Sequence, residues 1–394
     1  MQNLRVDLIA IIEPNMNYRI LLLSAYDAMS HKIWRGRLQE MFPEHEWTQL
    51  ALPPRHFNWR IRGNSLQWAL DEEECLTRDY DLLIATSMVD LASLRGFIPA
   101  LCELPTIVYF HENQFVYPTG LDQRSSNVEP QLVPLYCAYC SDAIVFNSDY
   151  NRSTFLQGAE TLLAKLPDRL SPSLLHKLQE SEVIPVPLEE IAQTSIPRKP
   201  GNILELVWNH RWEYDKGPQL LLQVAEKVLQ QRLRIRLHVV GQKFRSSPGE
   251  FERIAVVLTQ HATDTGIERG YCGFIEDREE YTELLRRCDV VLSTALHDFQ
   301  GLAIQEACLL GCTPLVPDKL VYPEYIGKQF LYPFAENDIS NANCEAVLAQ
   351  LKVWQHDKSE NTALPKAMLN EFSQHSLRPK YAALFERLLC RENR

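Results

Sequence analysis

The chain carries a series of short apolar runs in which apolar and polar residues do not alternate. In its first half these runs cover residues 19–24, 81–86, 106–110, 143–146 and 183–186. A strand with one face in water alternates between apolar and polar residues, whereas a parallel strand that helices cover on both faces is apolar throughout. The runs therefore predict an α/β fold built on a parallel sheet.

The same pattern restarts after a proline-rich segment. Four prolines stand between Ile184 and Gly201, and this composition is typical of a linker. Beyond the linker, apolar runs at 203–208, 236–240 and 290–293 alternate with helical patterns. A second parallel sheet is therefore expected in the second half of the chain.

Together the two halves predict two Rossmann-like domains with parallel sheets that face an interdomain cleft. We place the first domain at 1–190, the linker at 191–200 and the second domain at 201–394. The last helical stretch, near 377–390, could pack on either domain. Small-molecule sites prefer clefts between domains, so we expect the functional site there.

Several nucleotide-binding and hydrolytic classes are disfavoured by missing motifs. No two glycines are separated by a single residue, which excludes G-x-G-x-x-G, and no G-x-x-x-x-G-K-[ST] occurs. Dinucleotide-binding dehydrogenases and P-loop ATPases need those loops to hold phosphates. G-x-S-x-G and H-E-x-x-H are also absent, which argues against α/β-hydrolases and zincins.

Charge and cysteine content bound the partners and the compartment. The 40 basic and 51 acidic residues give a net charge of −11, so any nucleic-acid contact must come from a local basic patch. The ten cysteines are too sparse for a disulfide scaffold and predict reduced thiols in a cytoplasmic protein. No run of apolar residues is long enough to cross a membrane, so no membrane partner is expected.

The segment WNHRWEYDKG at 208–217 follows a predicted strand and contains Arg211 and Lys216. At the carboxyl end of a strand, such a pair would point into the cleft and could hold a diphosphate, with a planar fork from Arg and a point charge from Lys. A solvated loop with surface ion pairs would explain the same residues.

A second segment, STALHDFQGLAIQEACLLG at 293–311, runs from a strand end through Asp298 into a helix that begins near Gly301. The start of that helix favours an anionic group, and its carboxylates can accept hydrogen bonds from sugar hydroxyls. Glu306 lies on an otherwise apolar helix, where burial without a partner would be costly. A surface-facing Glu306 is the alternative.

Two segments of the first half complete the candidates. VYFHENQFVYP at 108–118 takes a buried strand directly into His111, which could bind a hydroxyl or stabilise developing charge; a satisfied core histidine is the alternative. PRHFNWRIR at 54–62 mixes cations with Phe57 and Trp59, a pattern typical of contacts to unpaired nucleic acid. A loop that covers the sheet would explain it as well.

Four segments carry a family resemblance: YFHENQFVYP, WNHRWEYDK, STALHDFQGLAIQEACLLGC and DKLVYPE. They resemble the glycosyltransferase-like-domain-containing family, retaining GT-B glycosyltransferases whose characterised animal member adds mannose to queuosine in tRNA. The likeness covers about residues 20–330. The broad pattern of such enzymes is R-x(4)-K followed by E-x(7)-E. Here Asp298 replaces the first Glu, and Gln300 stands where an aromatic residue is usual.

The resemblance implies a donor domain at 201–394, an acceptor-side domain at 1–190, and transfer of a hexose, expected to be mannose from GDP-mannose, onto queuosine in the anticodon loop with retention. Arg211 and Lys216 would hold the diphosphate, Glu306 the donor ribose, and His111 would face the reacting carbon. The implied catalytic residues are His111, Arg211, Lys216 and Asp298. The implied donor contacts are Asn209, Arg211, Lys216, His297, Asp298, Gly301, Leu302 and Glu306. The implied acceptor contacts are Arg55, His56, Trp59, Arg60, Arg62, Glu112, Asn113 and Gln114. No metal or cofactor beyond the sugar nucleotide is expected.

Two other functions fit the same residues. A glycosyltransferase with a lipid or polysaccharide acceptor would keep the donor chemistry, but it should show a basic amphipathic face of sufficient length in the first domain. A non-catalytic module that binds tRNA or a nucleotide would show saturable binding without turnover, and Asp298 in place of Glu keeps it open.

Overall fold

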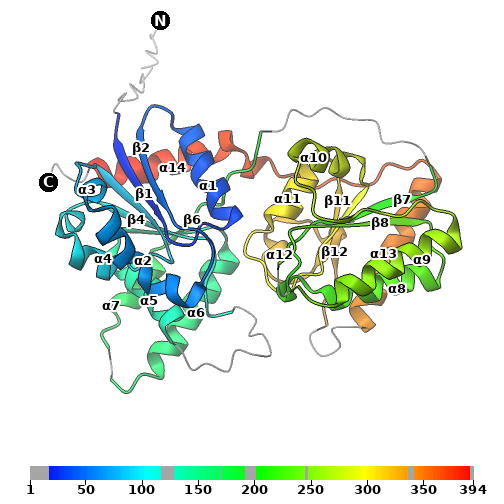
Figure 1. Cartoon of the computed structure of the whole chain (residues 1–394), viewed down its shortest axis with the longest axis horizontal. Helices are drawn as coiled ribbons and strands as arrows, with labels where there is room; N and C mark the ends of the chain where they lie inside the picture. Colours follow the sequence, from blue (N-terminus) through cyan, green and yellow to red (C-terminus); the bar gives the residue numbers. More distant parts are fainter. Residues whose placement is uncertain are drawn as a thin grey trace, which may run out of the picture.

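The computed structural model describes residues 17–116, 128–168, 170–190, 201–244, 247–335 and 341–390. It contains two parallel six-stranded sheets side by side, with strand orders β2-β1-β3-β4-β5-β6 and β12-β11-β10-β7-β8-β9 (Figure 1). The predicted α/β class with parallel sheets is confirmed. The predicted linker, 191–200, lies outside the described residues.

The first sheet consists of β1 (Arg19–Ser24), β2 (Glu46–Ala51), β3 (Leu82–Thr86), β4 (Thr106–Phe110), β5 (Ala143–Phe146) and β6 (Glu182–Val183). Its helices are α1 (Met29–Met41), α2 (Phe57–Asp71), α3 (Glu73–Leu76), α4 (Leu91–Phe97), α5 (Glu129–Cys140), α6 (Asp149–Ala164) and α7 (Ser173–Gln179). A 3₁₀ helix, η1, covers Pro99–Cys102.

The second sheet consists of β7 (Leu204–Trp208), β8 (Ile235–Val240), β9 (Cys272–Gly273), β10 (Val290–Leu292), β11 (Thr313–Pro317) and β12 (Leu331–Tyr332). Its helices are α8 (Pro218–Gln230), α9 (Glu250–Thr265), α10 (Arg278–Arg287), α11 (Leu302–Leu309), α12 (Tyr322–Tyr325) and α13 (Asn341–Ser359). The 3₁₀ helices η2 (Tyr214–Lys216), η3 (Lys328–Phe330) and η4 (Asn370–Phe372) and helix α14 (Gln374–Leu389) complete the chain.

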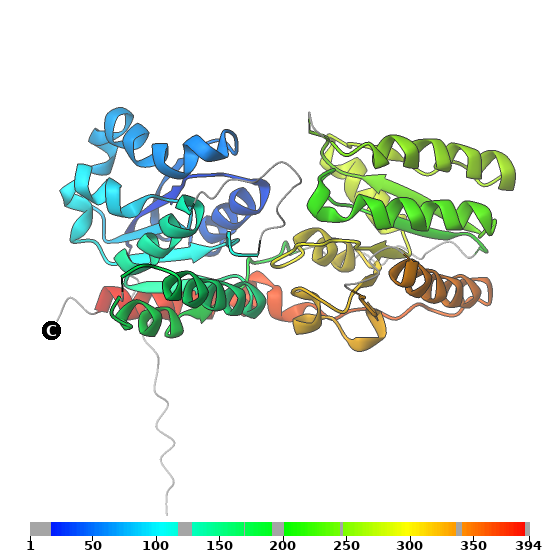
Figure 2. The same ribbon diagram turned by 90° about the horizontal axis from the view of Figure 1, so that it is seen from below.

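Strand β1 shows why the apolar runs do not alternate. Leu21 and Leu23 pack into a core with residues of α2, α4, α5 and α6, whereas Ile20 and Leu22 pack into a core with residues of α1 and α14. Helices therefore cover both faces of the sheet, as Figure 2 shows for each domain. Both faces of the strand are buried, so nearly every position favours an apolar side chain.

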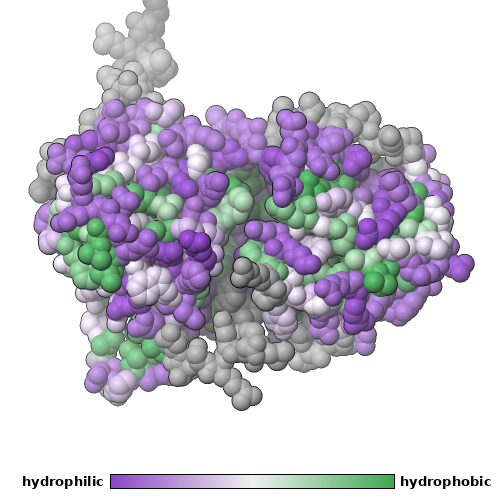
Figure 3. Space-filling view, viewed as in Figure 1, coloured by the Kyte–Doolittle hydropathy of each residue, from purple (hydrophilic) through white to green (hydrophobic). Residues whose placement is uncertain are grey.

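The final helix returns to the first domain. Helix α14 packs on the face of the first sheet that α1 also covers (Figure 1). The indole N–H of Trp34 donates to the hydroxyl of Tyr381 (2.9 Å), and that hydroxyl donates to the carbonyl of Pro185 (3.2 Å). The chain thus crosses twice between the domains, once near Pro185 and once near α14. Figure 3 shows the surface hollowed between the two domains.

Candidate functional site in the interdomain cleft

Two loops meet at the carboxyl ends of β7 and β10, which are neighbours in the second sheet. We call residues 209–217 and 293–301 the donor loops. The carbonyl of Asp215 accepts from the backbone N–H groups of Leu296 (2.9 Å) and His297 (3.2 Å). Gly217 has a φ of +65°, and a Cβ built there would lie 1.9 Å from the carbonyl oxygen of Thr294. Only glycine allows so close an approach in this conformation.

Lys216 is buried between the donor loops. Its Nζ donates to the carbonyl of His297 (2.7 Å) and lies 3.2 Å from Asp215 Oδ2 and 3.9 Å from Asp298 Oδ2. The ammonium group is therefore fixed just before the start of α11. Lys216, the cation that the sequence predicted here, therefore lies in the site, where protein atoms hold its ammonium group away from solvent.

Asp298 links that cation to the start of α11. One carboxylate oxygen accepts from the backbone N–H of Gly301 (3.1 Å) and the other from the hydroxyl of Tyr322 (3.0 Å). Burial would raise the pKa of Asp298, but the positive charge of Lys216 and the hydrogen bond from Tyr322 lower it on balance. Asp298 is therefore ionised at neutral pH. Its contact with the N–H of Gly301 places the carboxylate at the start of α11, whose first residue is Leu302.

Glu306 has the partner that its apolar helix requires. It forms an ion pair with Arg278 of α10, and the hydroxyl of Tyr281 donates to its other oxygen (3.2 Å). Asn209 Nδ2 donates to Tyr281 Oη (3.1 Å) and to the carbonyl of Ala303 (2.8 Å). Asn209 Oδ1 is buried with no hydrogen-bond partner among the described residues. The Asn209 oxygen is thus available, beside Glu306, to accept a hydrogen bond from a ligand.

The histidines of the donor loops are neutral at pH 7. Burial, with the nearby charge of Lys216, lowers the pKa of His210 to about 4 and that of His297 to about 4. The positive charge of these loops therefore comes from Lys216 and Arg211.

Arg211 lies on the cleft side. Its guanidinium group is 2.9 Å from Glu213 Oε2, and its side chain is 44% exposed. Burial is the main cause that raises the pKa of Tyr26 in the first domain. The charges of Glu213 and Arg211 in the second domain also shift this pKa, which places them near the Tyr26 hydroxyl. Glu112 likewise raises the pKa of His297, although less than burial lowers it. The carboxyl edges of the two sheets therefore face each other.

His111 directly follows β4 and belongs to a histidine pair. Its ring stacks on His31 with centroids 4.0 Å apart and meets Trp34 edge-on. Burial lowers the pKa of His111 well below its usual value, and neither ring nitrogen has a hydrogen-bond partner in the described chain. His31 Nε2 lies 3.0 Å from Glu112 Oε2. A neutral His111 can therefore offer one donor and one acceptor to a ligand.

The sequence did not single out His31, Arg278 or Tyr281. The signal for His31 was present, because it opens a helix directly after β1, at the same sheet edge as His111. Arg278 and Tyr281 lie on α10 and contact Glu306 on α11. No local sequence pattern indicates that these two helices meet.

The basic segment 54–62 is mostly helical, because α2 begins at Phe57. Trp59 is 57% exposed, and Arg55, His56 and Arg62 are also exposed. Arg60 differs from the expectation, since it is buried and donates to Gln67 Oε1 (2.8 Å). The helical spacing turns Arg60 inward, whereas Trp59 and Arg62 face out.

The predicted contacts after His111 also divide. Asn113 is buried and donates to Asn151 Oδ1 (2.9 Å) and Thr154 Oγ1 (3.1 Å), so it fixes the loop against α6 and does not face an acceptor. Glu112 and Gln114 are half-buried.

Gln300, where the family resemblance expects an aromatic residue, joins the domains. Its Oε1 accepts from the N–H of Val186 (2.9 Å), and its Nε2 donates to the carbonyl of Val186 (2.9 Å). Glu324 of α12 accepts from the N–H groups of Asp149 (3.1 Å) and Tyr150 at the start of α6. The residue that departs from the pattern therefore has a structural role beside the cleft.

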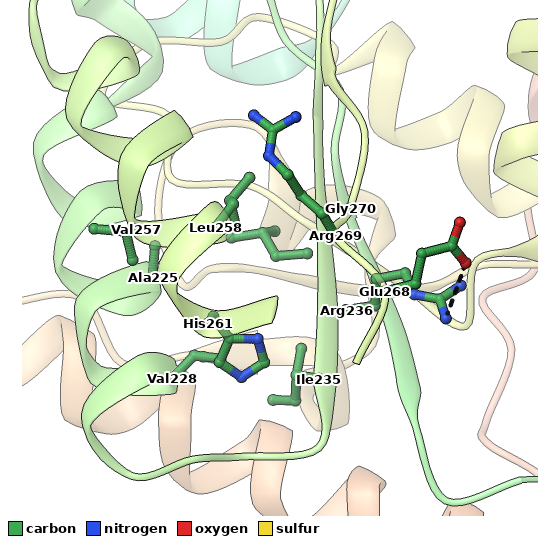
Figure 4. A pocket seen from close by; sticks show the side chains of 11 residues that line it. Ala225, Val228, Ile235, Arg236, Val257, Leu258, His261, Glu268, Arg269 and Gly270 are labelled. Atoms are coloured by element: carbon green, nitrogen blue, oxygen red, sulfur yellow. Dashed lines mark ion pairs between the residues drawn. The ribbon is translucent and has the colours of Figure 1, made fainter. Parts of the chain in front are cut away.

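A cavity between α8, α9 and β8, with a volume of about 10 Å³, is lined by Ala225, Val228, Ile235 and His261 (Figure 4). This volume holds about one water molecule. Among the described residues, no group of His, Cys, Asp or Glu could hold a metal ion, and no helix has the length and apolarity to cross a membrane.

Comparisons with known proteins divide along the same line as the fold. Residues 19–188 match the family model described as tRNA-queuosine alpha-mannosyltransferase N-terminal, and residues 192–358 match Glycosyl transferases group 1. The tRNA-queuosine alpha-mannosyltransferase of Drosophila melanogaster is 29% identical, over 95% of this chain and 98% of its own length. The first domain therefore matches the model of the tRNA-queuosine alpha-mannosyltransferase family, and the full chain is similar to a member of that family. The resemblance expected from the four segments is confirmed.

Other relatives share less. The lipopolysaccharide glucosyltransferase WaaG of Escherichia coli is 26% identical over 51% of this chain and 52% of its own length. An Escherichia coli trehalose-6-phosphate structure bound with UDP-2-fluoro glucose has a TM-score of 0.62 at 15% identity, covering 94% of this chain and 99% of the other. Anabaena HepE in complex with UDP has a TM-score of 0.57 at 14% identity, covering 95% and 96%. These structures show that the chain has the GT-B fold.

Proposed function

We propose that this protein transfers a hexose from a sugar nucleotide to queuosine in tRNA, and that the donor is GDP-mannose. The observation that supports it best is the division of the two family matches. The second half matches a model shared by glycosyltransferases in general, whereas the first half matches one specific to tRNA-queuosine mannosyltransferases. The match on the second half therefore points to an activated sugar as the donor, whereas the match on the first half points to queuosine in tRNA as the acceptor.

The donor loops are suited to the departure of a diphosphate. As the bond between the anomeric carbon and the phosphate oxygen breaks, negative charge grows on the diphosphate and positive charge on the sugar. Lys216 and Arg211 stabilise the leaving group, and because Lys216 is already held in place, little reorganisation is needed during the reaction. Asn209 and Glu306 accept hydrogen bonds from donor hydroxyls, with Glu306 exchanging its contact with Arg278.

The first domain supplies the acceptor side. A hydroxyl of queuosine forms the new bond to the anomeric carbon, and its proton passes to the departing phosphate oxygen, so the step needs no further reactant. Attack on the face from which the diphosphate leaves retains the configuration. His111 hydrogen-bonds the sugar from the opposite side of the cleft. A tRNA acceptor is consistent with a cytoplasmic enzyme.

The test is direct. Purified protein is incubated with queuosine-containing tRNA and GDP-mannose, UDP-glucose or ADP-glucose in parallel, and the digested nucleosides are analysed by mass spectrometry. We expect one added hexose on queuosine with GDP-mannose, in the α configuration by NMR of the isolated nucleoside. The same tRNA lacking queuosine is the control. No hexose on queuosine with any donor would refute the acceptor, and transfer from another donor alone would refute GDP-mannose.

A further inference from the structure

The indole ring of Trp59 covers Gly63 on helix α2. A Cβ built on Gly63, one helical turn further on, would lie 2.4 to 2.7 Å from three atoms of the Trp59 ring. The ring therefore occupies the space that any other side chain at this position would need. Trp59 is nevertheless 57% exposed. Part of the ring rests on the helix at Gly63, and a large part of the side chain remains open to solvent.

The surroundings of Trp59 favour an anionic partner. No Asp or Glu occurs in the chain between Glu46 and Asp71, although the whole protein has a net charge of −11. Arg55 and His56 are exposed immediately before α2. Burial, and after it the positive charge of Arg55, lowers the pKa of Arg60, so two cations lie close together at this end of the helix. Arg62, further along the helix, is paired with Asp90 and Glu129.

This end of α2 lies on the cleft side of the first domain. Helix α2 follows β2, and all strands of the sheet are parallel, so Trp59 in the first turn lies near the same sheet edge as His111. Phe57 meets Tyr26 edge-on, with ring centroids 5.9 Å apart. Tyr26 is the residue whose hydroxyl lies within reach of the charge of Arg211 across the cleft.

We propose that Trp59, laid over Gly63, is a stacking platform for an unpaired base of the acceptor RNA. The proposal deepens the proposed function and rests on it. Unpaired bases are recognised by stacking on aromatic faces while nearby cations hold the backbone. A stacked base would anchor the RNA at the rim and leave the modified nucleotide free to enter the cleft.

Binding of a fluorescently labelled anticodon stem–loop carrying queuosine tests the platform, by anisotropy at one fixed salt concentration. Trp59→Ala should weaken binding by about 5- to 150-fold, the range that one stacked base contributes. Trp59→Phe should recover a large part of the affinity. Gly63→Ala should weaken binding as well, because the added methyl group displaces the ring, while the melting temperature should not fall, since alanine favours a helix. Leu70→Ala, an equally apolar change at an exposed position of α2, should leave the affinity unchanged.

The outcomes separate this proposal from the proposed function. Wild-type transfer to queuosine-tRNA combined with unchanged affinity in Trp59→Ala and Gly63→Ala would overturn the platform alone. An equal loss in Leu70→Ala would also overturn it, because a broad apolar docking surface would then explain the exposed ring. Failure of the wild type to modify queuosine would refute the proposed function. A larger KM for tRNA in Trp59→Ala with unchanged GDP binding by thermal shift would support the platform.

Discussion

Replacing Lys216 by methionine tests whether the buried cation holds the donor loops together. The substitution keeps the length and apolar character of the side chain and removes only the ammonium group. In the native protein that group is 2.7 Å from the carbonyl of His297, 3.2 Å from Asp215 and 3.9 Å from Asp298. Without it, two buried carboxylates lose their nearest positive charge. Breaking a buried ion pair costs about 3–5 kcal/mol.

A loss of that size is measurable by calorimetry. In a domain of this size 1 kcal/mol shifts the melting temperature by about 2–4 °C, so we expect the second domain of Lys216→Met to melt about 6–20 °C lower. The double variant Lys216→Met/Asp298→Asn removes one of the stranded charges and should recover part of the loss. The difference between the double and the single variants measures the coupling of the pair.

The same variant should also react slowly at temperatures where it is folded. Loss of one charge-assisted contact to the leaving group costs about 2–4 kcal/mol in the transition state, a factor of about 30 to 1000 in rate. A melting temperature within about 2 °C of the wild type would refute the buried ion pair. A normal rate per folded molecule in a destabilised Lys216→Met would refute the role of Lys216 in leaving-group stabilisation.

Three further changes test other parts of the structure. His210 has a pKa of about 4 when folded and about 6.5 when unfolded, so the unfolded state binds more protons between these values and stability should fall as pH drops from 6.5 to 4, by about 3 kcal/mol for this residue. Urea unfolding at several pH values should show a flatter dependence in His210→Asn. Gln300→Leu leaves the N–H and carbonyl of Val186 without partners and should cost about 2–5 kcal/mol, whereas an unchanged urea midpoint would show that these bonds contribute nothing. Gly217→Ala places a methyl group against the carbonyl of Thr294 at a positive φ and should lower both stability and nucleotide binding by thermal shift; wild-type values for both would contradict the packing of the donor loops.

Several elements were predictable because their signals are local. The apolar runs at 106–110 and 143–146 are strands β4 and β5. Strand β2 was missed because it lies at the edge of the sheet and is only partly buried, so its sequence lacks the continuous apolar pattern.

The site shows the same division. Arg211, Lys216, Asp298 and His111 were singled out because they follow predicted strands, and the carboxyl ends of parallel strands meet at one edge. Their roles came from the family resemblance. The partners that hold these residues come from distant segments, and no periodicity encodes them.

By itself the sequence determined the fold class, the presence of two parallel sheets and the segments in which the candidate site residues lie. Burial on both faces of a strand and position at a strand end leave local traces in composition. Only the tertiary structure decided that Arg278 pairs with Glu306, that His31 stacks on His111 and that Gln300 bridges the domains. The orientations of Arg60 and Asn113, both turned inward, were decided there as well. The physical reason is that a side chain's partner and direction depend on the packing of elements far apart in the chain, and many distant arrangements are compatible with one local pattern.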